Sequence, residues 1–294
     1  MAWLQLRLDC EPASAANLED ALLGVGALSV TLEDRADQPL LEPRVGETPL
    51  WDAIRLTGLF PADTDMNPVL AALPGPSRDN ARVEILEDKD WEREWMSHYE
   101  PMAFGERLWI CPSWKTPPDP GAVNLLLDPG LAFGTGTHPT TAMCLEAVDR
   151  FAGAQQKVVD YGCGSGILGI AALRLGASRL LAVDNDPQAL VASADNAERN
   201  GIDPRSIEVA LPDDYDKQAW KGQSELVLAN ILAGPLAELA EPITDLMAPG
   251  ARLVLAGLLD TQADELIATY AAQLPLTVFA QRDEWVCLSG VTPT

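Results

Sequence analysis

The chain has 294 residues, of which 47% are hydrophobic and 22% charged, as expected for a globular protein long enough to form two domains. Its formal net charge of −24 disfavours direct binding to the phosphate backbone of a nucleic acid. The two histidines are far apart and the five cysteines are scattered, which favours neither a metal site nor disulfides. The sequence shows no export signal and no apolar run of about 18 residues, so we expect a cytoplasmic protein without a membrane span.

The acidity of the chain has two explanations. A net charge far from zero keeps a protein soluble, and charge alone favours this explanation. The same field would also attract a basic macromolecule and speed its encounter with the protein. A basic partner therefore has to be inferred from other features of the sequence.

Residues 1–90 alternate short strand patterns with helix patterns. The expected elements are a strand within 3–8, a helix that follows Ser14 and reaches about Leu23, and strands at 27–32 and 54–60. A helix capped by Asp63, Thr64 or Asp65 is expected to end at Leu73 before Pro74-Gly75-Pro76, and a strand is expected at 83–86. The order strand–helix–strand–strand–helix–strand predicts a ferredoxin-like domain with one open sheet face.

Residues 91–127 are assigned to a linker between two domains. The charged and aromatic segment 87–100 predicts a helix with Trp91, Trp95 and Met96 on one side. That apolar stripe favours core packing, with a recognition surface as the alternative. Two strands are expected at 107–111 and 123–127, on either side of a proline-rich loop.

The second domain is predicted over residues 128–294, where strand and helix patterns alternate. The expected strands are 157–161, 180–183, 207–211, 226–228 and 253–255, the expected helices 167–175, 187–199, 236–247 and 263–273, and the expected final hairpin 277–280 with 285–288. Such alternation predicts a parallel sheet covered by helices on both faces, which is an α/β fold.

The turn after strand 157–161 carries the strongest sign of a ligand site. Gly162, Gly164 and Gly166 permit positive φ angles and a close approach of the ligand. The helix behind the turn points its free N–H groups at the same place. Asp184 ends the next strand, where a carboxylate can accept hydrogen bonds from both ribose hydroxyls of an adenosine-type ligand.

Two classes of cofactor fit this turn. Gly164, Gly166 and Gly169 match the GxGxxG fingerprint, so an NAD-dependent dehydrogenase is one alternative. Asp160 favours S-adenosylmethionine, because its carboxylate could meet the cationic α-amino group directly or through water, whereas a pyrophosphate gains nothing from it. Asn230 also favours it, because it places an amide at the carboxyl edge of the sheet, where open α/β folds carry out their chemistry. Either residue could instead only stabilise a turn.

The segment from Asp128 to Thr141 is rich in glycine and hydroxyl side chains, which is typical of a loop that covers a ligand. Phe133 could lie over the cofactor, and Thr141 could donate a hydrogen bond to its carboxylate. His138 could act as a general base, but its place before Pro139 at a helix start favours a local hydrogen-bonding role.

Five segments together resemble one bacterial enzyme family: DPGLAFGTGTHPTT, VVDYGCGSGILGIAAL, VDNDPQAL, DNAERNGI and NILAGPL. The family is that of the methyltransferases of large-subunit ribosomal protein eleven, and the similarity extends to LEDKDWEREW and FGERLWICPSW. The resemblance implies a Rossmann-like class I methyltransferase domain and an N-terminal α+β ferredoxin-like domain that recognises the basic ribosomal protein. It also implies transfer of methyl groups from S-adenosylmethionine to lysine side chains and to the N-terminal amine of that substrate.

The resemblance also assigns site residues. The family's cofactor-binding positions correspond to Thr141, Gly162, Asp184 and Asn230, and Gly164 completes the glycine turn. Asn230, with neighbouring backbone carbonyls, is expected to orient the amine, and the proton is expected to leave to water without a dedicated base. Three alternatives to this function remain at this point: an NAD-dependent dehydrogenase, a ribosome-associated adaptor without activity, and a methyltransferase for another basic protein or a small amine.

Overall fold

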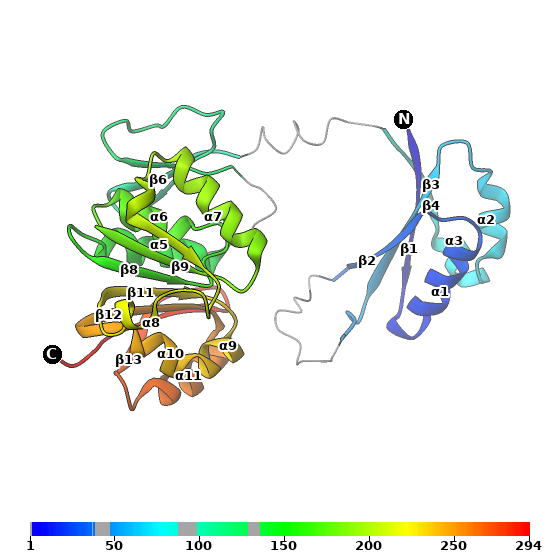
Figure 1. The fold of residues 1–294 in the computed structure, drawn as a ribbon. Helices are drawn as coiled ribbons and strands as arrows, with labels where there is room; N and C mark the ends of the chain where they lie inside the picture. The colour runs from blue at the N-terminus through cyan, green and yellow to red at the C-terminus, as the bar shows by residue number, and fades with distance from the viewer. Residues whose placement is uncertain (1, 37, 39–47, 88–98, 129–135) are drawn as a thin grey trace. The chain divides into compact units, whose positions relative to one another are not determined.

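The computed structural model describes residues 2–36, 38, 48–87, 99–128 and 136–294, in two compact units that span residues 1–97 and 98–294 (Figure 1). The strands expected in the linker therefore belong to the second unit, which begins about 30 residues before the boundary expected at Asp128. Most of the segment in which a linking helix was expected, with Trp91, Trp95 and Met96, lies outside the described residues, as does Phe133. Among the described residues, no helix is long and apolar enough to cross a membrane.

The first unit has the predicted ferredoxin-like arrangement. Its elements are β1 (Trp3–Cys10), α1 (Pro12–Gly24), β2 (Ser29–Asp34), β3 (Ile54–Pro61), α2 (Met66–Ala72), α3 (Gly75–Asn80) and β4 (Arg82–Leu86). The strands form an antiparallel sheet in the order β2-β3-β1-β4. Leu6 and Leu8 of β1 pack with Leu18 and Leu22 of α1 in the core of this unit.

Two boundaries in the first unit differ from the prediction, and proline is the reason in both. Helix α1 begins at Pro12 rather than after Ser14, because proline fits the first turn of a helix, where its missing N–H has no intrahelical acceptor. Pro74-Gly75-Pro76 does follow α2, but for the same reason it also begins the short helix α3.

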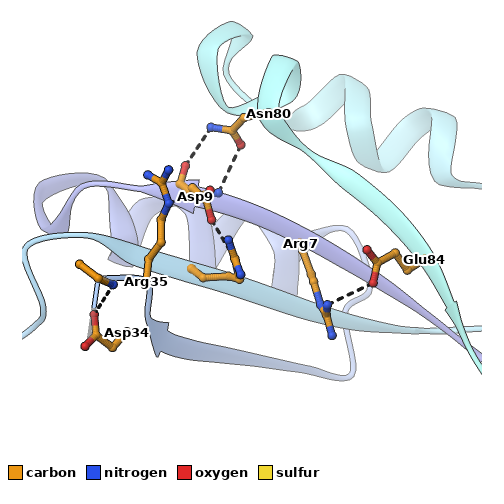
Figure 2. A network of polar contacts seen from close by, with 8 residues as sticks. Arg7, Asp9, Asp34, Arg35, Asn80 and Glu84 are labelled. Atoms are coloured by element: carbon orange, nitrogen blue, oxygen red, sulfur yellow. Dashed lines mark hydrogen bonds and ion pairs between the residues drawn. The ribbon is translucent and has the colours of Figure 1, made fainter. Parts of the chain in front are cut away.

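The second face of this sheet carries polar side chains. Arg7 and Asp9 alternate along β1 with the buried leucines, and Figure 2 shows their contacts. The Arg7 guanidinium lies 3.1 Å from the Glu84 carboxylate, and the Asp9 carboxylate lies 3.0 Å from Arg55 and 3.1 Å from Arg35. The described helices of the unit pack their apolar side chains against the opposite face.

The second unit is built around a seven-stranded sheet in the order β10-β9-β8-β11-β12-β14-β13. Its strands are β8 (Lys157–Tyr161), β9 (Arg179–Val183), β10 (Ile207–Ala210), β11 (Ser224–Asn230), β12 (Met247–Leu259), β13 (Leu276–Arg282) and β14 (Trp285–Val291). Strands β8 to β12 pair in parallel, and β14 pairs antiparallel with both of its neighbours. This mixed α/β sheet with a terminal hairpin confirms the predicted fold class.

Helices cover both faces of this sheet, as predicted (Figure 1). On one face lie α5 (Pro139–Phe151), α6 (Ile167–Arg174) and α7 (Pro187–Arg199), together with a small sheet of β5 (Met102–Phe104), β6 (Leu108–Cys111) and β7 (Val123–Leu126). On the other face lie α8 (Lys217–Trp220), α9 (Ala233–Glu238), α10 (Ala240–Asp245) and α11 (Ala263–Tyr270).

The single helix predicted over 236–247 is wrong, because the chain forms α9 and α10 with a break at Leu239. Pro242 has no N–H with which to continue the hydrogen-bond ladder of α9, and it is accommodated within the first turn of α10. Strand β12 then begins at Met247, six residues before the predicted start of that strand.

Candidate functional site

Three neighbouring strands end together at one edge of the sheet. The order β9-β8-β11 places the ends of these strands, at Val183, Tyr161 and Asn230, side by side. Because the three strands are parallel, the segments that follow them leave from the same carboxyl edge. The glycine turn, Asp184 and Asn230 therefore meet where the sequence predicted a site.

The glycine turn is held against both neighbouring strands. Gly162 has φ +79° and donates its N–H to the Val183 carbonyl at 2.7 Å. A Cβ atom on Gly162 would overlap the Cγ2 atom of Ile231, which follows β11. Gly166, with φ +76°, begins helix α6. Glycine is therefore required in this turn both for the backbone angles and for the close approach of β11.

The Asp184 side chain is bound to the same turn. Its Oδ2 atom accepts a hydrogen bond from the Gly164 N–H at 2.9 Å, and its Oδ1 atom accepts one from the Asp186 N–H at 3.0 Å. Each carboxylate oxygen can accept a second hydrogen bond. The half-buried Asp184 carboxylate is thus fixed in orientation and retains acceptor capacity for hydroxyl groups of a ligand.

The Asn230 side chain is held by a hydrogen bond to helix α5. Its Nδ2 atom donates to the Thr141 hydroxyl at 3.2 Å, and Thr141 is 1% exposed near the start of α5. This bond orients the side-chain amide, and no described residue donates a hydrogen bond to its Oδ1 atom. The structure thus brings together all five predicted site residues at the carboxyl edge of the sheet. They form two hydrogen-bonded groups: the glycine turn with Asp184, and the Thr141–Asn230 pair.

Asp160 lies beneath the turn and is 1% exposed. Its Oδ2 atom accepts a hydrogen bond from the Gly169 N–H at 2.9 Å, whereas its Oδ1 atom has no partner among the described residues. Burial raises the pKa of this carboxyl to about 7, the Gly169 N–H opposes that rise, and the negative charge of Asp184 adds to it. An orphaned carboxylate oxygen fits an ammonium group or an ordered water at this place, as the methionine part of S-adenosylmethionine requires.

Asp160 should make stability depend on pH. Because its pKa is about 7 in the folded chain and 3.8 when exposed, the folded chain holds a proton between these pH values that the unfolded chain has released. The free energy of unfolding therefore falls as pH rises through this window, by about 2–3 kcal/mol between pH 5 and pH 8 from this group alone. Urea unfolding of wild type and Asp160→Asn at both pH values measures this contribution as the difference between the two proteins. If the free energy of unfolding changed with pH equally in both proteins, the raised pKa of a buried Asp160 would be contradicted.

His138 has the local role that its position predicted. Its Nδ1 atom accepts a hydrogen bond from the Thr140 N–H at 3.3 Å and lies 2.7 Å from the Thr140 hydroxyl, so His138 caps helix α5. Its ring meets Trp285 edge-on, with the ring centres 5.0 Å apart, and burial lowers its pKa. Among the described residues, no group of three or more His, Cys, Asp or Glu side chains could hold a metal ion.

Gly257, which no sequence pattern singles out, supports the position of Asn230 from the adjacent strand β12. Gly257 lies in β12 with φ +90°, at a register irregularity opposite β14. A Cβ atom on it would overlap the carbonyl oxygen of Ile231 and lie 2.7 Å from the carbonyl carbon. The backbone immediately after Asn230 can occupy its position only because residue 257 has no side chain.

The variant Gly257→Ala should lose about 3 kcal/mol or more of stability, because it combines a positive φ angle with an overlap against backbone. Any relaxation moves Ile231 and with it Asn230, so activity should fall as well. Gly234→Ala is the matched control, since a Cβ at Gly234 meets nothing within 4 Å and helix α9 tolerates alanine. Chemical unfolding of both variants checks this, and equal stabilities would refute the packing role of Gly257.

Known proteins resemble the chain over its whole length. The family model described as ribosomal protein L11 methyltransferase matches residues 2–293. A ribosomal protein L11 methyltransferase of Pseudomonas aeruginosa (strain LESB58) is 54% identical over 293 residues, which cover 99% of this chain and 98% of that protein. One from Ectopseudomonas mendocina (strain ymp) is 55% identical over 294 residues, covering 99% of each chain. A crystal structure of a ribosomal protein L11 methylase from Lactobacillus delbrueckii subsp. bulgaricus matches with a TM-score of 0.57 and 27% identity, covering 67% of this chain and 99% of that one.

Proposed function

Because the chain belongs to the ribosomal protein L11 methyltransferase family, we propose that it transfers methyl groups to lysine side chains and to the N-terminal amine of ribosomal protein L11. The methyl donor is S-adenosylmethionine, which supplies a sulfonium methyl group already activated for transfer. The observation that carries the proposal is the meeting of the glycine turn, Asp184 and the Thr141–Asn230 pair at one sheet edge.

The residues at this sheet edge would bind different parts of S-adenosylmethionine. Asp184 would accept hydrogen bonds from the ribose hydroxyls, in an orientation set by the N–H groups of Gly164 and Asp186. Gly162 would let the ligand approach the backbone closely, and the orphaned Oδ1 atom of Asp160 would offset the charge of the α-amino group, directly or through water. Thr141 would donate to the carboxylate of the donor.

The acceptor amine must lose its proton before transfer. A free lysine is mostly protonated at neutral pH, and neutralising it at pH 7.4 costs about 4 kcal/mol. An apolar surrounding reduces that cost by lowering the pKa of the amine. Asn230 would then accept a hydrogen bond from the neutral amine through its Oδ1 atom, which orients the nitrogen toward the methyl group, and the proton would leave to water.

The first unit would recognise the ribosomal protein. Residues 1–97 contain 19 acidic and eight basic residues, so the unit attracts a basic partner over long range. The polar face of its sheet offers oriented charged groups, such as the Glu84 carboxylate beside Arg7 (Figure 2) and the Asp9–Arg55 pair. Reaction with a ribosomal protein also leads us to infer a cytoplasmic location.

Mass spectrometry of purified ribosomal protein L11, after incubation with the full chain and S-adenosylmethionine, tests this proposal. We expect increments of one methyl mass on lysine-containing peptides and on the N-terminal peptide. A bound but unmodified ribosomal protein would support an adaptor instead. Modification of other basic proteins at equal rates would show that the substrate assignment is wrong.

A further inference from the structure

Three polar side chains lie along the buried side of helix α7. Ser193, Asn196 and Asn200 are spaced by three and four residues, so they form one row on the helix. Their exposed fractions are 0%, 9% and 6%. The last two belong to the segment DNAERNGI, to which the proposed function assigns no role.

Two members of this row hydrogen-bond to backbone carbonyls of the glycine turn. The Ser193 hydroxyl donates to the Gly164 carbonyl at 3.0 Å, and the Asn196 amide donates to the Ser165 carbonyl at 2.9 Å. In a trans peptide the carbonyl and the following N–H point in opposite directions. Fixing these two consecutive carbonyls on α7 therefore directs the N–H groups of Ser165 and Gly166 away from the helix.

The third member connects the same helix to the end of β7. The Asn200 side chain accepts a hydrogen bond from the Leu126 N–H at 2.7 Å and donates to the Leu126 carbonyl at 2.8 Å. Its Nδ2 atom also donates to the Asn196 carbonyl at 2.8 Å. Helix α7 itself starts just after Asp184, with Asp186 as its N-cap. One helix thus fixes Asp184, the glycine turn and the end of β7 relative to one another.

We propose that Ser193 and Asn196 are positioning residues for the cofactor, acting through the carbonyls of Gly164 and Ser165. This rests on the assignment of S-adenosylmethionine made above. When these carbonyls are held, Gly164 keeps its N–H on Asp184, and the backbone of the turn retains the conformation that the ligand contacts. Without them the turn has to be reordered when the ligand binds, which weakens affinity for the donor but leaves the transfer step unchanged.

The test compares Asn196→Ala and Ser193→Ala with Val191→Ala. Val191 lies on the exposed side of the same helix and is 62% exposed, so its variant controls for general effects on α7. Calorimetric titration with S-adenosylhomocysteine gives the dissociation constant, and steady-state kinetics give KM and kcat. We expect the dissociation constant and the KM for the donor to rise about tenfold in Asn196→Ala and somewhat less in Ser193→Ala. The kcat at saturating donor should stay within about threefold, and Val191→Ala should bind like wild type.

Other outcomes separate this proposal from a merely structural role. If both variants lower the melting temperature but bind S-adenosylhomocysteine like wild type below it, the row only stabilises the fold and the proposal is overturned. If Asn196→Ala does not fold, Ser193→Ala decides by the same criteria, because it removes a single hydroxyl. If wild type itself fails to bind S-adenosylhomocysteine, the cofactor assignment fails rather than the positioning role.

Discussion

Replacing Asp184 with alanine should weaken binding of S-adenosylmethionine at least a hundredfold. Two hydrogen bonds from ribose hydroxyls to a carboxylate would be lost, each worth about 1.5–3 kcal/mol. The N–H groups of Gly164 and Asp186 would also lose the acceptor that orients them. Calorimetric titration with S-adenosylhomocysteine gives the change in dissociation constant directly.

Two further variants show whether this loss belongs to the Asp184 carboxylate. Asp184→Asn keeps one acceptor oxygen, so its affinity should lie between those of alanine and wild type. Asp186→Ala removes a nearby carboxylate that caps α7 by accepting a hydrogen bond from the Gln188 N–H at 2.8 Å. It should cost about 1 kcal/mol of stability and little affinity. Wild-type affinity in Asp184→Ala would remove this residue from the cofactor site.

Replacing Asn230 with alanine should lower kcat by about a hundredfold or more. The side chain would no longer hold the neutral amine in line with the methyl group, and misalignment of reacting groups by about 1 Å can cost that much. The dissociation constant for S-adenosylhomocysteine should change less than kcat does. Methyl transfer to ribosomal protein L11 at saturating donor measures the effect.

Substitutions of Thr141 test whether the orientation of the Asn230 side chain matters for turnover. Thr141→Ser keeps the hydroxyl that accepts the Asn230 hydrogen bond, and it should retain most of the turnover. Thr141→Val has nearly the same shape but no acceptor, so Asn230 loses its anchor and kcat should fall by about tenfold. Unchanged turnover in Asn230→Ala would exclude this side chain from the mechanism.

The parts of the fold that the sequence predicted well are those with local signals. Helix α7 spans the residues 187–199 that were expected, because Pro187 in its first turn and the Asn200-Gly201 pair after its last turn are signals that act within a few residues. The glycine turn and Asp184 were found for the same reason, since both directly follow strands that are apolar in sequence.

Other features depend on packing between distant segments. The need for glycine at position 257 arises from the backbone of Ile231, directly after the neighbouring strand β11, and no pattern within β12 shows it. The polar row of α7 looks like an ordinary hydrophilic segment until the glycine turn is placed against it. The break between α9 and α10 is not apparent from the apolar pattern over 236–247, and it follows from Pro242, which has no N–H with which to continue the ladder of α9.

A crystal structure of the chain with S-adenosylhomocysteine would test most directly whether one sheet edge forms the cofactor site. We predict the ribose hydroxyls within hydrogen-bond distance of Asp184, and the amino-acid part of the ligand between the glycine turn and Asn230. An adenosyl group bound away from Asp184, or a ligand that touches neither Gly162 nor Asn230, would contradict this account.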